Sequence, residues 1–104
     1  MKLVIAMIKP FRLDAVRAAL TALDVRGMTV SEVLGSGDGG PGSAGKMVPR
    51  LKIEVVVEDR QLGTVIEAVQ GAAATGEVGD GKIFVAEVGK AVRIRTGETD
   101  EAAI

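Results

Sequence analysis

The stretch Arg50-Leu51-Lys52-Ile53-Glu54-Val55-Val56-Val57 decides the fold, because it alternates apolar and charged residues over most of its length. At a side-chain period of two, this alternation predicts a half-buried strand with one apolar face. Asp59 can then cap a helix that runs from Arg60 to about Thr75, and residues 82–88 form a second apolar strand. The inner stripe of the predicted helix is Leu62, Val65, Ile66, Val69 and Ala73.

The first half of the chain repeats this order of strand, helix and strand. Residues 2–8 are rich in β-branched side chains, residues 12–24 carry apolar side chains at helical spacing, and residues 28–34 read as a second strand. Two such units predict a single α+β domain over residues 1–104, with the ferredoxin-like order βαββαβ. The sheet is then antiparallel with four strands, and both helices cover one of its faces. A short extra strand is expected over residues 91–95.

The other face of this sheet is predicted to be bare. It would expose several valines and isoleucines, which form an apolar patch too large to leave in contact with water. Packing of sheet against sheet between copies of the chain would cover the patch. We therefore expect a homo-oligomer.

Composition excludes several classes of function. The chain has no cysteine and no histidine, which removes thiol chemistry, Cys/His metal sites and histidine acid–base work. Its net charge of −1 and its two aromatic residues, Phe11 and Phe84, do not suit nucleic acid. Without a 20-residue apolar run or a signal-peptide pattern, we expect a cytoplasmic protein that is not embedded in a membrane.

Two short motifs indicate a site for phosphate groups. In Gly76-Glu77-Val78-Gly79-Asp80-Gly81-Lys82, the glycines permit positive φ, so that successive N–H groups can converge on an anion beside a lysine. In Val92-Arg93-Ile94-Arg95, the spacing of a strand would place both guanidinium groups on one face. The glycine spacing matches neither the dinucleotide fingerprint nor the P-loop. A helix end at Gly76 followed by a simple turn is the alternative interpretation.

Residues 35–49 contain a glycine-rich run, Gly35-Ser36-Gly37-Asp38-Gly39-Gly40-Pro41-Gly42-Ser43-Ala44-Gly45. Such a run predicts a loop of high conformational entropy. It is either a plain hairpin connection or a functional loop, and its length favours function.

Over nearly its whole length the chain resembles the nitrogen regulatory P-II signalling proteins. The resemblance implies a homotrimer that binds ATP or ADP, with AMP as a further candidate, in clefts between subunits and regulates a partner enzyme or transporter. The matching stretches include Ile8-Lys9-Pro10-Phe11, Gly27-Met28-Thr29-Val30, Lys52-Ile53-Glu54, Thr75-Gly76, Gly79-Asp80-Gly81-Lys82-Ile83-Phe84-Val85 and Val92-Arg93-Ile94-Arg95-Thr96-Gly97-Glu98.

The resemblance also implies a role for individual positions. Residues 79–82 would wrap the phosphates, residues 93 and 95 would reach them from the neighbouring subunit, and four positions, Thr29, Gly35, Gly37 and Val56, would line the adenine and ribose end. The nucleotide-binding set expected on these grounds is Thr29, Gly35, Gly37, Asp38, Gly39, Arg50, Val56, Gly79, Asp80, Gly81, Lys82, Arg93, Ile94 and Arg95.

The chain departs from the family pattern in its long loop, which corresponds to residues 37–48, is shortened and has no tyrosine for uridylylation. Gly39 stands in place of a glutamine that helps to hold Mg²⁺ and 2-oxoglutarate. Asp38 replaces a basic residue near the terminal phosphate, and Arg50 replaces a lysine that pairs with 2-oxoglutarate. We therefore expect a weak or absent response to 2-oxoglutarate, although Asp38 offers an oxygen ligand for Mg²⁺.

Two other classes of function stay open at this point. An enzyme with slow ATP hydrolysis would use Lys82, Arg93 and Arg95 to stabilise developing charge, with Asp38 orienting water. A trimer without a ligand, similar to the divalent-cation-tolerance proteins, would use the glycine loop only as a turn.

Overall fold

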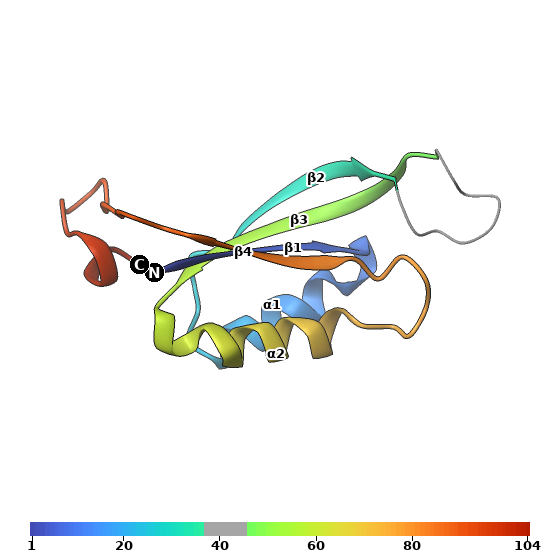
Figure 1. Cartoon of the computed structure of the whole chain (residues 1–104), viewed down its shortest axis with the longest axis horizontal. Coiled ribbons are helices and arrows are strands. Elements are labelled where there is room, and N and C mark those ends of the chain that lie inside the picture. The colour runs from blue at the N-terminus through green and yellow to red at the C-terminus, as the bar shows by residue number, and fades with distance from the viewer. Residues whose placement is uncertain (37–45) are drawn as a thin grey trace.

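The computed structural model describes residues 1–36 and 46–104. Figure 1 shows a twisted sheet with both helices packed on one of its faces. The elements in chain order are β1 (Lys2–Ile8), η1 (Pro10–Arg12), α1 (Leu13–Ala22), β2 (Thr29–Gly35), β3 (Val48–Val57), η2 (Asp59–Gln61), α2 (Leu62–Ala73), β4 (Lys82–Glu87) and η3 (Asp100–Ala103).

The sheet has the strand order β2-β3-β1-β4, and every neighbouring pair is antiparallel. One row of paired residues crosses all four strands, from Thr29 through Glu54 and Ile5 to Phe84. The predicted ferredoxin-like order βαββαβ is therefore confirmed.

The core lies between the sheet and the two helices. Val4, Ala6 and Ile8 of β1 point into it, as do alternate residues of β3, which explains the apolar alternation of that strand. Val16 and Leu20 of α1 are at most 1% exposed and lie on the face of the helix that covers the sheet. Burial of these apolar side chains is what holds the helices on the sheet.

Strand β3 begins at Val48, two residues before the predicted start at Arg50. Pro49 is tolerated inside β3 because it pairs only with Leu34 of β2, whereas β1 ends at Ile8, opposite Leu51. On the side of β3 that faces β1, no ladder hydrogen bond from the backbone of residue 49 is required.

The predicted cap of the second helix is wrong by one residue. Glu58, and not Asp59, is the N-cap of η2, the 3-10 turn that leads into α2, and it forms a capping box with Gln61. Asp59 instead accepts a hydrogen bond of 2.7 Å from the amino group of Met1, which ties the start of β1 to η2.

The face of the sheet opposite the helices is open in this chain. It carries Leu3, Ile5 and Met7 of β1 together with Phe84 of β4, which is 52% exposed. The apolar open face is therefore as predicted, although its large side chains are more varied than the expected valines and isoleucines. Lys52 and Glu54 lie on the same face, with Nζ of Lys52 3.9 Å from Oε1 of Glu54.

The expected strand over residues 91–95 does not form. The described chain has only an isolated bridge there, between Val92 and Thr99, and residues 94–96 make a turn. Figure 1 shows this C-terminal hairpin, residues 92–99, at the end of the molecule remote from the connection between α2 and β4. No helix in the described ranges is long and apolar enough to cross a membrane.

Candidate functional site

The connection between α2 and β4, residues 74–81, is held in shape by the carboxylate of Asp80. Its Oδ2 accepts hydrogen bonds from the backbone N–H groups of Thr75 at 2.8 Å and Gly76 at 3.0 Å. Its Oδ1 accepts one from the Thr75 hydroxyl and lies 3.2 Å from Nζ of Lys9. A single carboxylate thus joins both ends of the loop and the residue that follows β1.

These donors hold the pKa of Asp80 far below its ordinary value of 3.8. The hydroxyl of Thr75 has the largest effect, followed by the Thr75 backbone N–H, and Lys9 and the Gly76 N–H add to them. Hydrogen bonds and a nearby cation stabilise the charged form of a carboxyl group. Asp80 is therefore ionised under physiological conditions.

Glycines are required in this loop by its backbone. Gly76, Gly79 and Gly81 have φ values of 83°, 89° and 106°, a region that L side chains rarely adopt. A Cβ on Gly79 would lie 2.9 Å from Nη2 of Arg50, and one on Gly81 would collide with the backbone of Met7. The loop consequently runs close against the end of β1 and the side chain of Arg50.

A cleft of ≈ 620 Å³ opens beside this loop, between it and the neighbouring ends of β2 and β3. Three basic residues border it: Lys46, Arg50 and Lys82. The Arg50 guanidinium is held in place by donating a hydrogen bond of 2.8 Å from Nη1 to the carbonyl oxygen of Pro49. The described residues that line the cleft are Met7, Val33, Leu34, Gly35, Ser36, Lys46, Val48, Arg50, Val78, Gly79, Asp80, Gly81, Lys82 and Phe84.

The chemistry of the cleft suits an anion with an apolar part. Cationic side chains and a tight glycine turn favour phosphate or carboxylate oxygens. Phe84, Val33 and Val48 offer apolar surface for the rest of a ligand. Among the described residues, no group of three or more acidic side chains is placed to hold a metal ion.

The structure brings six of the expected nucleotide-binding residues together in this cleft. They are Gly35, Arg50, Gly79, Asp80, Gly81 and Lys82. Thr29 is outside the lining and is exposed at the start of β2, and Val56 is half-buried in β3, pairing with Leu3. Gly37, Asp38 and Gly39 lie outside the described residues, as does most of the shortened loop over residues 37–48.

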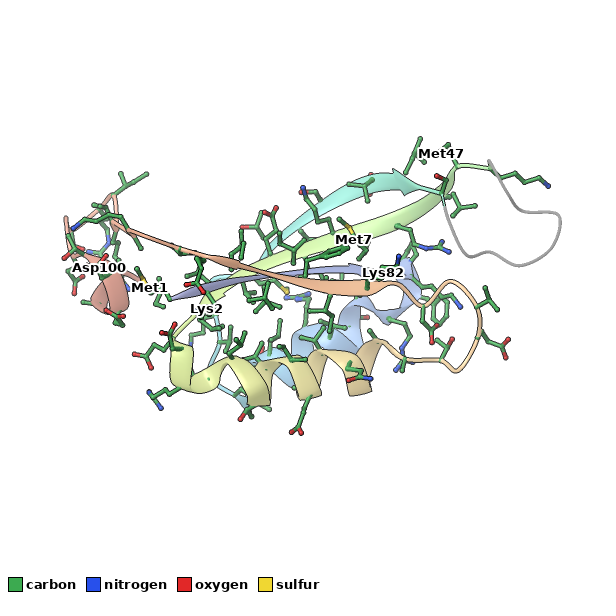
Figure 2. The ribbon with its side chains drawn as sticks, viewed as in Figure 1. Met1, Lys2, Met7, Met47, Lys82 and Asp100 are labelled. Atoms are coloured by element: carbon green, nitrogen blue, oxygen red, sulfur yellow. The ribbon has the colours of Figure 1, made fainter. Side chains whose placement is uncertain are left out.

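Arg93, Ile94 and Arg95 do not reach the cleft of their own chain. The prediction that a strand would present both arginines on one face is wrong, since this segment forms a turn closed by the hydrogen bond from Gly97 N to the Arg93 carbonyl oxygen, 2.8 Å. Nη1 of Arg93 lies 3.4 Å from Oε1 of Glu98, and Ile94 is 99% exposed. Figure 2 shows Lys82 well separated from Asp100, which belongs to the same C-terminal segment.

Sequence reasoning gave no role at this site to Lys9, Thr75 and Lys46, nor to the apolar side chains that line the cleft. Lys9 and Thr75 stand in stretches that resemble the P-II family, Thr75 also at the expected end of the second helix, and Lys46 lies in the expected loop over residues 35–49. For Lys9 a signal existed, because antiparallel pairing of β1 with β4 sets Met7 opposite Lys82 and so brings Lys9, which follows β1, close to Asp80. The contact of Lys46 with the cleft depends on how the long loop leaves the sheet, which no local pattern shows.

The fold and this cleft define a ferredoxin-like domain with a basic, glycine-lined cleft at one end of its sheet. A family model described as nitrogen regulatory protein P-II matches residues 1–98. A nitrogen regulatory protein P-II of Rhizobium etli is 48% identical over 112 aligned residues that cover 100% of both chains. The nitrogen regulatory proteins GlnK and P-II 1 of Escherichia coli K12 are 48% and 46% identical, with the same coverage.

The chain therefore belongs to the nitrogen regulatory P-II family and is a regulatory signalling protein. Members of this family are generally signalling proteins and not enzymes.

Proposed function

We propose that this protein binds ATP or ADP with the phosphates against residues 79–82, and that the bound nucleotide sets whether it engages a partner enzyme or transporter. The observation that carries the proposal is the loop fixed by Asp80. The carboxylate of Asp80 and the positive φ values of Gly79 and Gly81 hold the backbone in a tight turn beside Lys82 through contacts within the chain itself. A site that needs no reordering loses less binding free energy to conformational entropy.

The remainder of the nucleotide site follows from the same cleft. Gly35 and Phe84 border it at the side of the open sheet face, where the flat adenine ring has apolar surface to cover. We propose that Thr29 and Val56 line the part of the site that holds the adenine and the ribose. We propose that Gly37, Asp38 and Gly39 also belong to the nucleotide site. AMP is a third candidate ligand that would use only the nearest phosphate contacts.

We further propose that the protein is a homotrimer whose sites lie between subunits. The C-terminal hairpin lies at the end of the molecule remote from the cleft (Figure 1); Ile94 and Arg95 are exposed in its turn, and the partly exposed Arg93 comes just before that turn. A neighbouring copy can supply these arginines to the phosphates. Such packing would also cover Ile5, Met7 and Phe84 on the open face.

Arg50 is the residue of this cleft that we expect to meet a carboxylate ligand such as 2-oxoglutarate. Arginine binds carboxylates with a planar fork of donors, but Arg50 would act without the side-chain amide of the glutamine that Gly39 replaces and without the basic residue that Asp38 replaces. We therefore propose that Mg²⁺ and 2-oxoglutarate add little to nucleotide affinity here.

Calorimetric titration with ATP, ADP and AMP, each with and without Mg²⁺ and 2-oxoglutarate, tests the proposal. Lys82→Ala should weaken ATP binding by about tenfold or more, because it removes a charge-assisted contact to phosphate. Arg17→Ala is the matched control, since Arg17 is an exposed cation on α1 outside the cleft. Absence of binding by the unmodified protein would contradict the proposal, and a strong gain from 2-oxoglutarate would contradict its second part.

A further inference from the structure

Lys9 is the first residue after β1, and its side chain points to the loop over residues 74–81. Nζ lies 3.2 Å from Oδ1 of Asp80 and 3.3 Å from Oγ1 of Thr75. Its Cε lies 3.7 Å from the position that a Cβ on Gly79 would occupy. The Lys9 side chain is 15% exposed and that of Asp80 is 26% exposed, so this ion pair is partly shielded from water.

The carboxylate of Asp80 presents an electrostatic problem in a cleft for phosphates. Asp80 borders the cleft, and its charge would repel a polyphosphate at short range. Three of its four partners, the Thr75 hydroxyl and the N–H groups of Thr75 and Gly76, are neutral. Lys9 supplies the positive charge that balances the carboxylate.

We propose that Lys9 is a positioning residue that neutralises Asp80, and that this neutralisation lets the cleft favour ligands with more phosphate groups. This inference rests on the proposed nucleotide binding. Lys9 acts through Asp80: it holds Oδ1 at the side of the loop nearer β1 and cancels its charge there. Without Lys9 the same loop would carry an unbalanced negative charge beside Lys82 and oppose each added phosphate.

Arg12 provides a comparison, because it supports the start of the loop without neutralising the charge of Asp80. Its Nε donates a hydrogen bond of 2.9 Å to the carbonyl oxygen of Ala72, and its Nη2 donates one of 2.5 Å to the same oxygen. Arg12 therefore anchors the end of α2, just before the loop, without contacting Asp80. Loss of Arg12 should loosen the loop for all nucleotides alike.

The experiment compares Lys9→Met with Arg12→Met by calorimetric titration with ATP, ADP and AMP. For Lys9→Met we expect a loss of about tenfold with ATP and about twofold with AMP, because the repulsion grows with ligand charge. For Arg12→Met we expect equal losses with all three ligands. Equal losses in Lys9→Met would overturn the proposal.

Two further variants show whether the effect passes through Asp80. Lys9→Arg keeps the charge and should retain the preference for ATP. The double variant Lys9→Met/Asp80→Asn removes both charges and should recover most of the ATP affinity lost in Lys9→Met. If the double variant binds ATP no better than Lys9→Met, Lys9 does not act by neutralising Asp80.

A measurement without nucleotide separates this inference from the proposed function. In Lys9→Met, the backbone amides of Thr75 and Gly76 should exchange faster with solvent, since the acceptor that holds them is less firmly placed. Unchanged exchange would contradict a positioning role for Lys9. Failure of the unmodified protein to bind nucleotide would contradict the proposed function, while the amide exchange would still decide whether Lys9 holds Asp80.

Discussion

Gly81 lies so close to the backbone of Met7 that a Cβ on Gly81 would stand 1.7 Å from the Met7 carbonyl oxygen. Gly81 also has a φ of 106°. The loop that leads into β4 can therefore cross the end of β1 only if this residue has no side chain. Gly76 has a comparable φ of 83°, yet a Cβ there would meet nothing within 4 Å.

Gly81→Ala and Gly76→Ala consequently form a matched pair. Gly76→Ala should lower the free energy of unfolding by about 1 kcal/mol, the usual effect of an L side chain in the left-handed region. Gly81→Ala should lower it by about 2 kcal/mol more, because backbone must also move to admit the methyl group. Urea unfolding measures both, and equal losses would mean that the contact with Met7 relaxes freely.

Asp80 should make stability depend on pH in the acid range. Its folded pKa lies below the unfolded value of 3.8, so its contribution is fully present above that value and is lost as the pH falls through the folded pKa. Asp80→Asn should therefore be less stable than the unmodified protein at pH 7, and the gap in urea midpoint should shrink below about pH 4.

The control for this pH series is Glu67→Gln, which removes an exposed carboxylate from the middle of α2. Its urea midpoint should follow that of the unmodified protein at each pH. A gap for Asp80→Asn that stays constant down to pH 3 would show that the lowered pKa of Asp80 does not contribute to stability.

Subunit mixing tests whether Arg93 and Arg95 act on a neighbouring chain. A Lys82→Ala protein and an Arg93→Ala/Arg95→Ala protein should each bind ATP poorly. Mixed trimers of the two should recover one intact site in three, because one interface then joins an unmodified loop to unmodified arginines. Binding stoichiometry after mixing measures this recovery, and no recovery would assign the arginines to some other role.

Truncation of a buried core side chain should lower the free energy of unfolding. Leu20 is 1% exposed and packs between α1 and the sheet, so that Leu20→Ala should lower the free energy of unfolding by about 2–5 kcal/mol. Arg17→Ala, one turn earlier on the exposed side of α1, should change it by less than about 0.5 kcal/mol. Chemical unfolding followed by circular dichroism distinguishes the two.

The order of strands and helices could be predicted because period and composition agree along most of the chain. Residues 2–8 form the strand that their β-branched run predicts, and Ile53, Val55 and Val57 of the alternating run point into the core. Strand β3 begins before the alternating run, at Val48, and so includes a proline, a residue that usually ends a strand. Pro49 is compatible with β3 only because β1 does not extend alongside it, and that depends on pairing between distant segments.

The site could be predicted only in part, for a similar reason. Three glycines before Lys82 indicate a loop of special conformation, and all three have positive φ. The contact between Lys9 and Asp80 could not be derived from local sequence, because the two residues lie 71 positions apart (80 − 9). The alternation of residues 92–95 predicted a strand that does not form, because no partner strand is present in the described chain to keep residues 91–95 extended.

The separation of the cleft from the C-terminal hairpin has a thermodynamic consequence. If a ligand is held by the loop of one copy and the arginines of the next, ligand binding and association become a single linked equilibrium. The apparent affinity would then fall when the protein is diluted below the concentration at which its copies dissociate. By the same mass action, saturating ligand would keep copies together at dilutions where the free protein comes apart.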